Sequence, residues 1–542
     1  MIPRNAAAGA ALVLGVLTSS VGCASAPTPS PTAPTRGHAT PGAAPRGPLA
    51  WAPFDAETFA RAKRERKHIV LDGSAEWCHW CHVMEATTYH DPAVRAVLDR
   101  HFIAVKVDVD SRPDLEERYG DWGWPATVVF DPDARELAKY RGYIEPAKFA
   151  ALLQEIVASG AAGTAAAELP LGEAAKGPLS EETLGWIQSF CEAELADYYD
   201  EDEGGWGRTQ KAPLGGNNAW MLHRAATDAE ARRVALFTLD KQAKLIDPVW
   251  GGIYQYSAAR DWDHPHFEKL MTFQAPALDN YARAYALTRD PASLARARAV
   301  HRYVERFLKG PDGGFYTTQD ADLNAHDRSR PFMDGHDYYR LPGPERERHG
   351  YPRVDTHEYG RENGLAIAAY VSLYEATGDA AVLAAAERAH ARVLATHATA
   401  SGGLGHDAGA EPKVVFLSDN AAMGLATMRL WEATKKPEHL ATARRLAAFL
   451  RAALSDPKSG AYFSATPDPD AAGVFAARRV PFEDNVAALR FLARLARADG
   501  DPAVRAEIGR VLRGISTVAQ IKARGRWLGD YLLALDETRG VR

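Results

Sequence analysis

Residues 75–85 read AEWCHWCHVME, and this stretch decides the fold of the N-terminal part of the chain. Cys78 and Cys81 enclose two residues where a strand-like run, 68–72, gives way to a helix-like run, 83–98. A C-x-x-C pair in a strand-to-helix setting is typical of redox-active dithiols. The start of a helix offers free backbone N–H groups and the positive end of a dipole, and both favour a thiolate. The sequence therefore predicts a redox turn at this pair.

Length and charge limit the classes of protein to which the chain can belong. The chain has 542 residues, of which 46% are hydrophobic, with 64 Lys and Arg against 70 Asp and Glu. A chain of this length is expected to form two or more domains with buried cores. The formal charge of -6 comes without a basic block of the kind that binds phosphates. We therefore expect no nucleic-acid partner.

The first 22 residues resemble a bacterial lipoprotein signal peptide. An apolar run, 6–17, is too short to span a bilayer, and small residues lead from it to Cys23. The resemblance implies that Cys23 carries a lipid that anchors the protein to a membrane, although Ser20 stands where leucine is usual. Ordinary signal-peptidase cleavage near Ala26 is the alternative. In both cases we expect an exported protein, either periplasmic or membrane-anchored.

Alternating strand and helix patterns follow a tether at residues 23–50, which is rich in Pro, Ala and Thr and is expected to be flexible. The predicted elements are a helix at 54–67, strands at 68–72, 102–108, 126–130 and 137–143, and helices at 112–119 and 145–158. This order predicts a small α/β domain at residues 51–160.

The string LDGSAEWCHWC, residues 71–81, resembles the strand, buried acid and Trp-Cys-x-x-Cys turn of thioredoxin. The resemblance implies that Asp72 is the buried acid and that Lys106 is the lysine near it. Trp124-Pro125 matches the Ile-Pro of that family, whose proline is cis and packs against the disulfide. Inside the turn, His-Trp replaces the Gly-Pro of thioredoxin.

These residues predict a mechanism of thiol–disulfide exchange. Cys78 would attack a partner disulfide as a thiolate, and Cys81 would resolve the mixed disulfide. Asp72 and Lys106 would handle the proton of the buried thiol. A protonated His79 beside Cys78 would stabilise the thiolate, so we predict a more oxidising potential than Gly-Pro would give. The partner would be a protein thiol or disulfide client, and no cofactor besides the disulfide is implied.

Other interpretations of the same residues stay open. A C-x-x-C can be half of a zinc site, and His79 and His82 are close, but the sequence has no second C-x-x-C to complete four ligands. The pair can also be a static structural disulfide. Asp72 could merely cap the turn, and Lys106 could be an ordinary solvated strand residue. Cys191 stands alone in a helical stretch and is expected to pack as a small apolar residue.

A linker rich in Ala, Gly and Pro at residues 161–179 precedes a second domain, 180–542, in which the period is helical. Twelve helices are predicted, at 181–197, 218–227, 230–246, 272–288, 291–309, 361–377, 379–397, 418–434, 437–454, 482–499, 501–517 and 526–537. Loops such as Gly251-Gly252-Ile253-Tyr254 recur between them, which indicates repeated hairpins. The pattern resembles the all-α (α/α)6 toroid of six-hairpin glycosidases and sugar epimerases, and an open α-solenoid is the alternative.

Polar clusters lie in the predicted loops of this second domain. One contains His264, His266 and Glu268, and another contains Asp320 and Asp322. Carboxylates and histidines that converge on a cleft can act as acid and base on a carbohydrate ligand; structural hydrogen bonding is the alternative. No metal site is predicted, because the spacing of the later loop histidines fits no ligand pattern. These histidines are His326, His336, His349 and His357.

The order of motifs along the chain resembles the spermatogenesis-associated, thioredoxin-like family of unknown function. The resemblance rests on CHWCHVME at 78–85, Gly-Trp-Pro at 123–125, HPHFEKLM at 264–271 and GGFYTTQDAD at 313–322. It implies a thioredoxin-like domain joined to an (α/α)6-like domain. Two function classes follow: an exported thiol-disulfide oxidoreductase whose toroid recognises a client or a glycan, and a carbohydrate-active enzyme, epimerase-like or hydrolase-like, with a structural or regulatory thioredoxin-like domain. A binding protein without enzymatic activity is the third.

Overall fold

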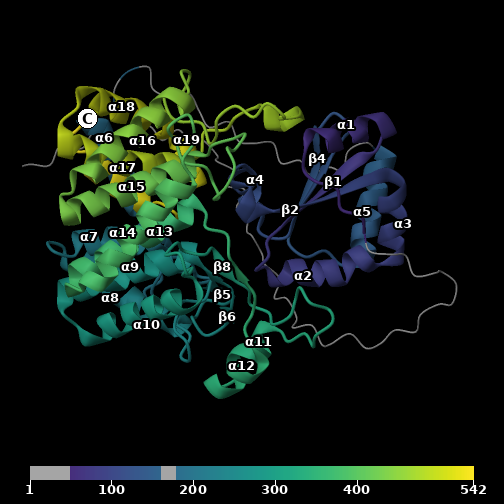
Figure 1. The fold of residues 1–542 in the computed structure, drawn as a ribbon, viewed down its shortest axis with the longest axis horizontal. Coiled ribbons are helices and arrows are strands. Elements are labelled where there is room, and N and C mark those ends of the chain that lie inside the picture. The colour runs from purple at the N-terminus through teal and green to yellow at the C-terminus, as the bar shows by residue number, and fades with distance from the viewer. Residues whose placement is uncertain (1–48, 160–176, 178) are drawn as a thin grey trace, which may run out of the picture. The chain divides into compact units, whose positions relative to one another are not determined.

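The computed structural model describes residues 49–159, 177 and 179–542, which form a thioredoxin-like domain followed by a helical toroid (Figure 1). The signal peptide, Cys23 and most of the tether and linker lie outside the described residues, so the statements about them stay predictions. Within the described ranges, no helix is long and apolar enough to cross a membrane.

A four-stranded sheet forms the centre of the first domain (Figure 1). In spatial order its strands are β2 (Phe102–Asp108), β1 (His68–Ser74), β3 (Ala126–Phe130) and β4 (Glu136–Arg141). β1 and β2 run parallel, β3 is antiparallel to β1, and β4 is antiparallel to β3. The helices of the domain are α1 (Ala56–Glu65), α2 (His79–Ala86), α3 (Pro92–His101), α4 (Pro113–Tyr119) and α5 (Pro146–Ser159).

Both faces of this sheet are covered because the side chains of a strand alternate between them. On β1, Val70 packs with Val94 of α3 and Leu153 of α5. Its neighbour Leu71 packs on the other face with Leu115 of α4. A strand that is buried on both faces reads as a continuous apolar run, which is how the sequence predicted it.

The helix predicted at 83–98 is two helices in the structure, α2 and α3. The break spans residues 87–91, and α3 begins at Pro92, which has no N–H to donate and therefore suits the first turn of a helix. Asp91 caps that helix, because its carboxylate accepts from the N–H groups of Ala93 at 2.9 Å and Val94 at 3.1 Å. The redox helix α2 is therefore short.

The helices of the second domain form a closed ring of hairpins. The inner helices are α7 (Gly215–Arg224), α9 (Met271–Thr288), α13 (Gly360–Thr377), α15 (Leu417–Thr434), α17 (Phe482–Asp499) and α20 (Gly529–Glu537). Each contacts the next, and α20 contacts α7. The outer helices are α6 (Glu181–Tyr198), α8 (Ala229–Gln242), α10 (Pro291–Phe307), α14 (Ala380–Thr396), α16 (Pro437–Phe449) and α18 (Pro502–Ile515). Closure of the ring excludes the open solenoid.

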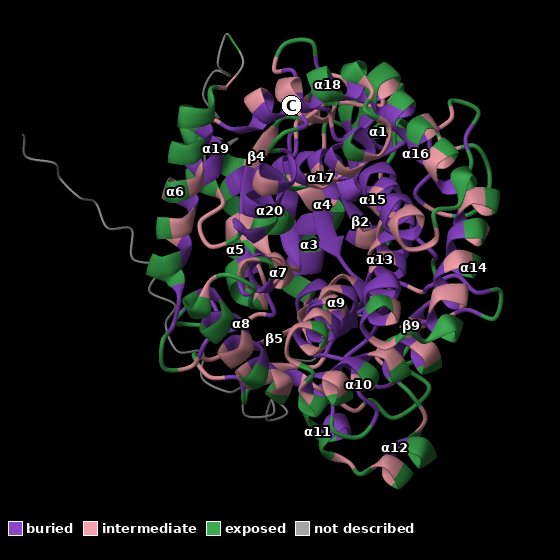
Figure 2. Cartoon of the chain, turned by 90° about the vertical axis from the view of Figure 1, so that its left-hand side faces the viewer, coloured by how far each residue is buried: buried purple, intermediate pink, exposed green. Residues whose placement is uncertain are grey.

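The twelve predicted helices correspond to these inner and outer helices. Figure 2 shows α9, α13, α15 and α17 largely buried, whereas the outer helices carry exposed residues on one side. Three short helices, α11 (Gly335–Arg340), α12 (Gly343–His349) and α19 (Val518–Ala523), were not among the predicted ones. They have few residues, so they give little helical periodicity to detect.

The recurring Gly-rich loops are held in place by amide side chains at the starts of inner helices. Asn363 of α13 accepts from the N–H of Phe315 at 2.8 Å, and Asn485 of α17 accepts from the N–H of Tyr462 at 2.8 Å. Gly252 adopts φ +75, and a Cβ there would lie 2.5 Å from the Tyr303 ring. The repeat in the sequence therefore corresponds to loops that are each hydrogen-bonded to an amide side chain of an inner helix. A glycine such as Gly252 allows the loop to pack closely against its neighbour.

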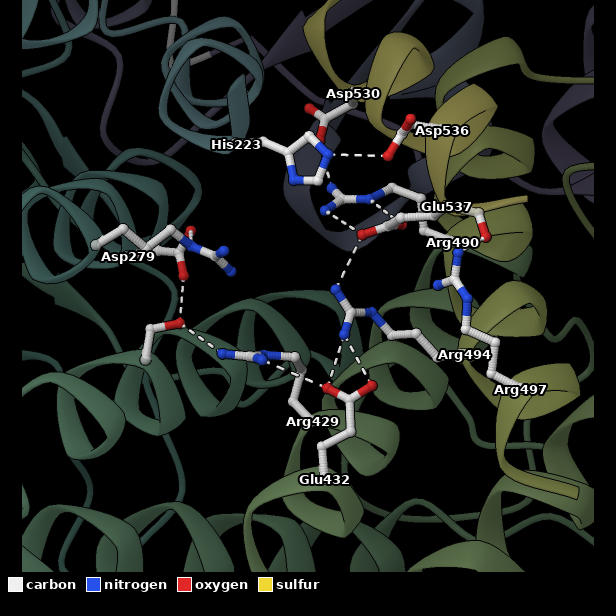
Figure 3. A network of polar contacts seen from close by, with 12 residues as sticks. His223, Asp279, Arg429, Glu432, Arg490, Arg494, Arg497, Asp530, Asp536 and Glu537 are labelled. Atoms are coloured by element: carbon white, nitrogen blue, oxygen red, sulfur yellow. Dashed lines mark hydrogen bonds and ion pairs between the residues drawn. The ribbon is translucent and has the colours of Figure 1, made fainter. Parts of the chain in front are cut away.

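A polar network joins the inner helices to one another (Figure 3). Arg494 of α17 donates to Glu432 of α15 at 2.7 Å and to Glu537 of α20 at 2.9 Å. Arg429 of α15 donates to Ser372 of α13 at 2.9 Å. Paired charges of this kind are costly to break singly, since the remaining partner would be left buried. The network therefore supports the closure of the ring.

Candidate functional site

Cys78 and Cys81 form a disulfide at the start of α2, with an S–S distance of 2.09 Å. Cys78 is the residue before the helix, and its Sγ accepts from the N–H of Cys81 at 3.2 Å. Each cysteine is 4% exposed. The pair therefore occupies the helix N-terminus that the sequence predicted, in a well-buried position.

The toroid covers this disulfide. Leu270 precedes α9, Phe273 lies in its first turn, and both pack in one apolar cluster with Trp77 and the two cysteines. A cavity of about 490 Å³ lies at the same place, between the redox turn and the toroid. Its lining includes Trp77, Cys78, Tyr256, His266, Glu268 and Arg361. Cys78, and not Cys81, is among the lining residues, so a molecule in the cavity meets Cys78 first.

A larger cavity, about 680 Å³, lies elsewhere. It is bounded by α1, α4 and toroid loops near Asp407 and Asp470, and neither cysteine lines it. Its size does not make it the site, because the reactive group is in the smaller cavity.

Asp72 is buried on β1, and its Oδ1 has no hydrogen-bond partner among the described residues. Burial raises the pKa of Asp72 to about 7, against the opposing charge of Lys106. Lys106 lies beside Asp72 on β2, but its Nζ donates to Glu85 Oε2 at 2.5 Å. The carboxyl of Asp72 therefore changes its protonation state near neutral pH, while Lys106 has another carboxylate as its direct partner.

The Trp124-Pro125 peptide bond is cis, as the resemblance to thioredoxin implied. The Trp124 ring packs against the apolar cluster that contains the disulfide. It also approaches Gly73 so closely that a Cβ there would lie 3.0 Å from the ring. The contact with the redox turn is therefore made by Trp124, the residue before Pro125.

Two of the three residues predicted at the first toroid loop reach the cavity. Glu268 is buried, its Oε2 has no hydrogen-bond partner among the described residues and lies 3.9 Å from His266 Nδ1, and burial raises the pKa of Glu268 to about 7. His266 stacks on Tyr256 with ring centroids 4.2 Å apart, and burial lowers the pKa of His266 to about 4. His264 is exposed and pairs with Asp261 at 2.8 Å, and it does not line this cavity.

Asp320 and Asp322 contact the redox helix instead of lining the cavity. Asp322 Oδ2 lies 2.7 Å from His79 Nδ1 and 3.4 Å from His82 Nδ1, and Asp320 Oδ2 lies 3.1 Å from His326 Nε2. Burial opposes the charged imidazole of His79, but the hydrogen bond to Asp322 together with the charges of Asp322, Glu268 and Asp334 raises the pKa of His79. The effect of His79 on the redox potential stays a prediction.

Sequence reasoning missed Asp110, which lines the cavity. Its Oδ2 accepts from Trp77 Nε1 at 2.7 Å, its main-chain oxygen lies 2.8 Å from His406 Nε2, and burial raises the pKa of Asp110 well above its usual range. Asp110 follows β2. Polar residues after the carboxyl end of a strand are a known signal for sites in α/β folds, and this signal could have found it.

Contacts of α4 join the first domain to the toroid. Glu116 pairs with Arg361 of α13 at 2.6 Å, and Glu117 pairs with Arg479 at 2.7 Å. Arg361 also pairs with Glu362 at 2.8 Å. Burial opposes the charged form of Arg361, but these carboxylates raise its pKa further above its usual range. An ion pair between the first domain and the toroid, Glu116 with Arg361, therefore lies at the cavity.

Known proteins resemble this chain in both of its domains. Residues 43–158 match the family model Thioredox_DsbH, described as a protein of unknown function, DUF255. Spermatogenesis-associated protein 20 of Homo sapiens is 29% identical over 321 residues, which cover 52% of this chain and 40% of the human protein. The thiol:disulfide interchange protein DsbD of Vibrio vulnificus (strain CMCP6) is 31% identical over 106 residues, 18% of each protein.

Among solved structures, cellobiose 2-epimerase from Spirochaeta thermophila DSM 6192 is similar with a TM-score of 0.50 at 16% identity. The match covers 66% of this chain and 97% of the epimerase, and it shows the fold of the toroid. The chain is therefore similar to spermatogenesis-associated protein 20 over 52% of its length, and it carries a match to the Thioredox_DsbH model ahead of a toroid that has the fold of cellobiose 2-epimerase.

Proposed function

We propose that the protein is a thiol-disulfide oxidoreductase that acts inside the cavity between the redox turn and the toroid. One observation carries the proposal: Cys78, at the start of a helix, lines a cavity of about 490 Å³. The similarity of the first domain to a thiol:disulfide interchange protein supports it. Export, with a membrane anchor at Cys23, is part of the proposal and rests on the predicted signal peptide.

The exchange takes two steps that start from the reduced pair. The Cys78 thiolate attacks one sulfur of the client disulfide, so that a mixed disulfide forms and the first client thiolate leaves. Asp72 accepts the proton of the Cys81 thiol, and the Cys81 thiolate attacks Cys78. The mixed disulfide breaks, the second client thiolate leaves, and the protein disulfide is formed. The client gains two electrons from the protein. A dithiol reductant then reduces the protein disulfide and restores the starting state. Run in reverse, the same steps oxidise a client dithiol.

The site selects clients by shape. Both cysteines are 4% exposed, and Leu270 and Phe273 pack beside them. A client must therefore present its sulfur on a narrow group, such as an extended peptide segment or a small disulfide. The role proposed for the toroid is to bind the remainder of that group, whether peptide or glycan.

The mixed disulfide provides the test of this proposal. In Cys81→Ala the resolving thiol is absent, so Cys78 is expected to form a stable adduct with oxidised glutathione. Intact-mass measurement of the full chain should show one adduct per molecule, located on Cys78 by peptide mapping. The matched control is Cys78→Ala/Cys81→Ala, which should show none. Absence of an adduct in the folded single variant would rule out exchange at this cysteine.

Carbohydrate chemistry is the second candidate, and Glu268 favours it. A buried carboxyl whose Oε2 has no hydrogen-bond partner among the described residues and whose pKa is about 7 can act as acid or base on a ligand in the cavity. His266 and Tyr256 form an aromatic surface beside it. Both residues line the same cavity as Cys78, so a glycan could occupy the place assigned to the client.

A sugar panel tests this second candidate by thermal shift. A sugar that binds the native state at about 100 times its Kd should add about 2.7 kcal/mol to the free energy of unfolding. A rise in Tm of several degrees is expected from that figure. Glu268→Gln should retain the shift and lose any turnover of the sugar that gives it. A panel without any shift would count against carbohydrate as a ligand.

A further inference from the structure

Two histidines and an aspartate bring donor atoms together at the outer side of the redox helix. One donor atom of each of His82, Asp320 and His326 lies within 4.8 Å of the other two. Asp320 Oδ2 is 3.1 Å from His326 Nε2 and 3.7 Å from His82 Nε2. The main-chain oxygen of Glu76 lies 3.1 Å from His82 Nε2 and 2.8 Å from His326 Nε2.

These separations of 2.8–3.7 Å lie on either side of those expected in a metal centre. Bonds of about 2.0–2.1 Å in a tetrahedral zinc site place neighbouring donor atoms about 3.3–3.4 Å apart. We propose that His82, Asp320 and His326 bind one divalent cation of the zinc class. Imidazole and carboxylate are ligands that such cations accept. The fourth position falls to water or to the main-chain oxygen of Glu76.

The surrounding hydrogen bonds orient two of the three ligands, His82 and Asp320. Asp322 Oδ2 lies 3.4 Å from Nδ1 of His82. In the tautomer that donates this Nδ1–H, the lone pair of Nε2 faces the cation, which is the arrangement found around metal-bound histidines. Asp320 Oδ1 accepts from the N–H of Asp322 at 2.9 Å, and this leaves Oδ2 for the cation.

The charges at the site also favour a cation beside Asp320. Asp320 and Asp322 are 2% and 1% exposed, and Glu268 nearby is 4% exposed. The ion-pair partners of the two aspartates among the described residues are imidazoles, which carry charge only when protonated. Buried carboxylates without compensating charge are costly. A divalent cation supplies that compensation, and a network of protonated imidazoles is the competing account.

The cation would join the two domains. His82 follows Cys81 directly on α2, whereas Asp320 and His326 lie in the toroid loop after β8 (Thr318–Gln319). A shared cation would therefore fix the toroid beside the redox turn. This inference rests on ligand geometry, and it holds whether or not the disulfide is catalytic.

Zinc binding by the full-length chain tests the proposal. The protein is kept oxidised, so that Cys78 and Cys81 offer no thiolate, and is treated with a chelator before titration with Zn²⁺ alone in a calorimeter. One zinc per chain is expected. His326→Ala and Asp320→Asn should lose that binding, and Asp322→Asn should weaken it about 10- to 100-fold, the usual effect of removing a residue that orients a ligand. His264→Ala, an exposed histidine paired with Asp261, is the matched control and should bind as the wild type does.

Two results would overturn the proposal. One is an oxidised wild-type protein that takes up no zinc. The other is equal binding by His326→Ala and His264→Ala. If His326→Ala fails to fold by circular dichroism, X-ray absorption of the zinc-loaded wild type decides. Two imidazoles per zinc support the site, and a zinc without them contradicts it.

Discussion

Replacement of Cys78 by serine is expected to reduce thiol-disulfide turnover to the uncatalysed background. Serine has no ionised form near neutral pH that could replace the thiolate as nucleophile. Cys81 cannot substitute for Cys78, because Cys78 is the cysteine that lines the cavity. The measurement is the reduction of a fluorescent peptide disulfide by dithiothreitol, with full-length protein as catalyst.

Cys191→Ala is the matched control for this substitution. Cys191 is a free, buried cysteine in α6, and burial raises the pKa of its thiol to about 12. It therefore stays a neutral thiol, and the variant is expected to retain wild-type turnover. Equal turnover by Cys78→Ser and the wild type would show that the pair is an inert structural disulfide.

Asp72→Asn is expected to slow turnover about 100-fold at neutral pH, the lower range of what a positioned acid or base contributes. The pKa of Asp72 is about 7 because of burial. Below pH 7 the carboxyl holds its proton and cannot accept the one from Cys81, so the rate of the resolving step should rise with pH through about 7. Single-turnover rates from pH 5 to 9 measure this profile, and the inflection should be lost in Asp72→Asn.

The free energy of unfolding of the oxidised protein should fall over the pH range in which the rate rises. Since the pKa of Asp72 is higher in the folded state than its ordinary value of 3.8, the unfolded state loses its proton first. Stability is therefore lost as pH rises from about 4 to 7. Asn cannot ionise, so the variant should gain free energy of unfolding relative to wild type above pH 7. Asp133→Asn, an exposed position paired with Lys63, should change neither profile. A wild-type rate without an inflection near pH 7 would contradict the role of Asp72.

Local patterns were enough to predict most elements of the fold. The strand at 102–108 and the strand at 126–130 coincide with β2 and β3, because each is an apolar run between turn signals. The predicted helix at 418–434 differs from α15 by one residue. Pro92 was present in the sequence as a helix-start signal, so the break between α2 and α3 could also have been predicted.

Long-range placement was not available from the sequence. Asp322 and His79 are 243 positions apart and meet at 2.7 Å, and no periodicity encodes such a contact. His264 and Glu268 lie four positions apart, yet one is exposed and the other buried in the cavity lining. The sequence therefore identified residue types that can take part in catalysis or binding. The packing of the toroid against the first domain decided which of them line the cavity with Cys78 and which do not.

The most direct test of the account is a redox titration of the full-length protein in dithiothreitol buffers, with free thiols alkylated and counted by mass. We expect a reversible two-electron transition in which Cys78 and Cys81 gain and lose their thiols together while the circular dichroism spectrum remains that of the folded protein. A pair that is reduced only when the protein unfolds would contradict it, because the disulfide would then be structural.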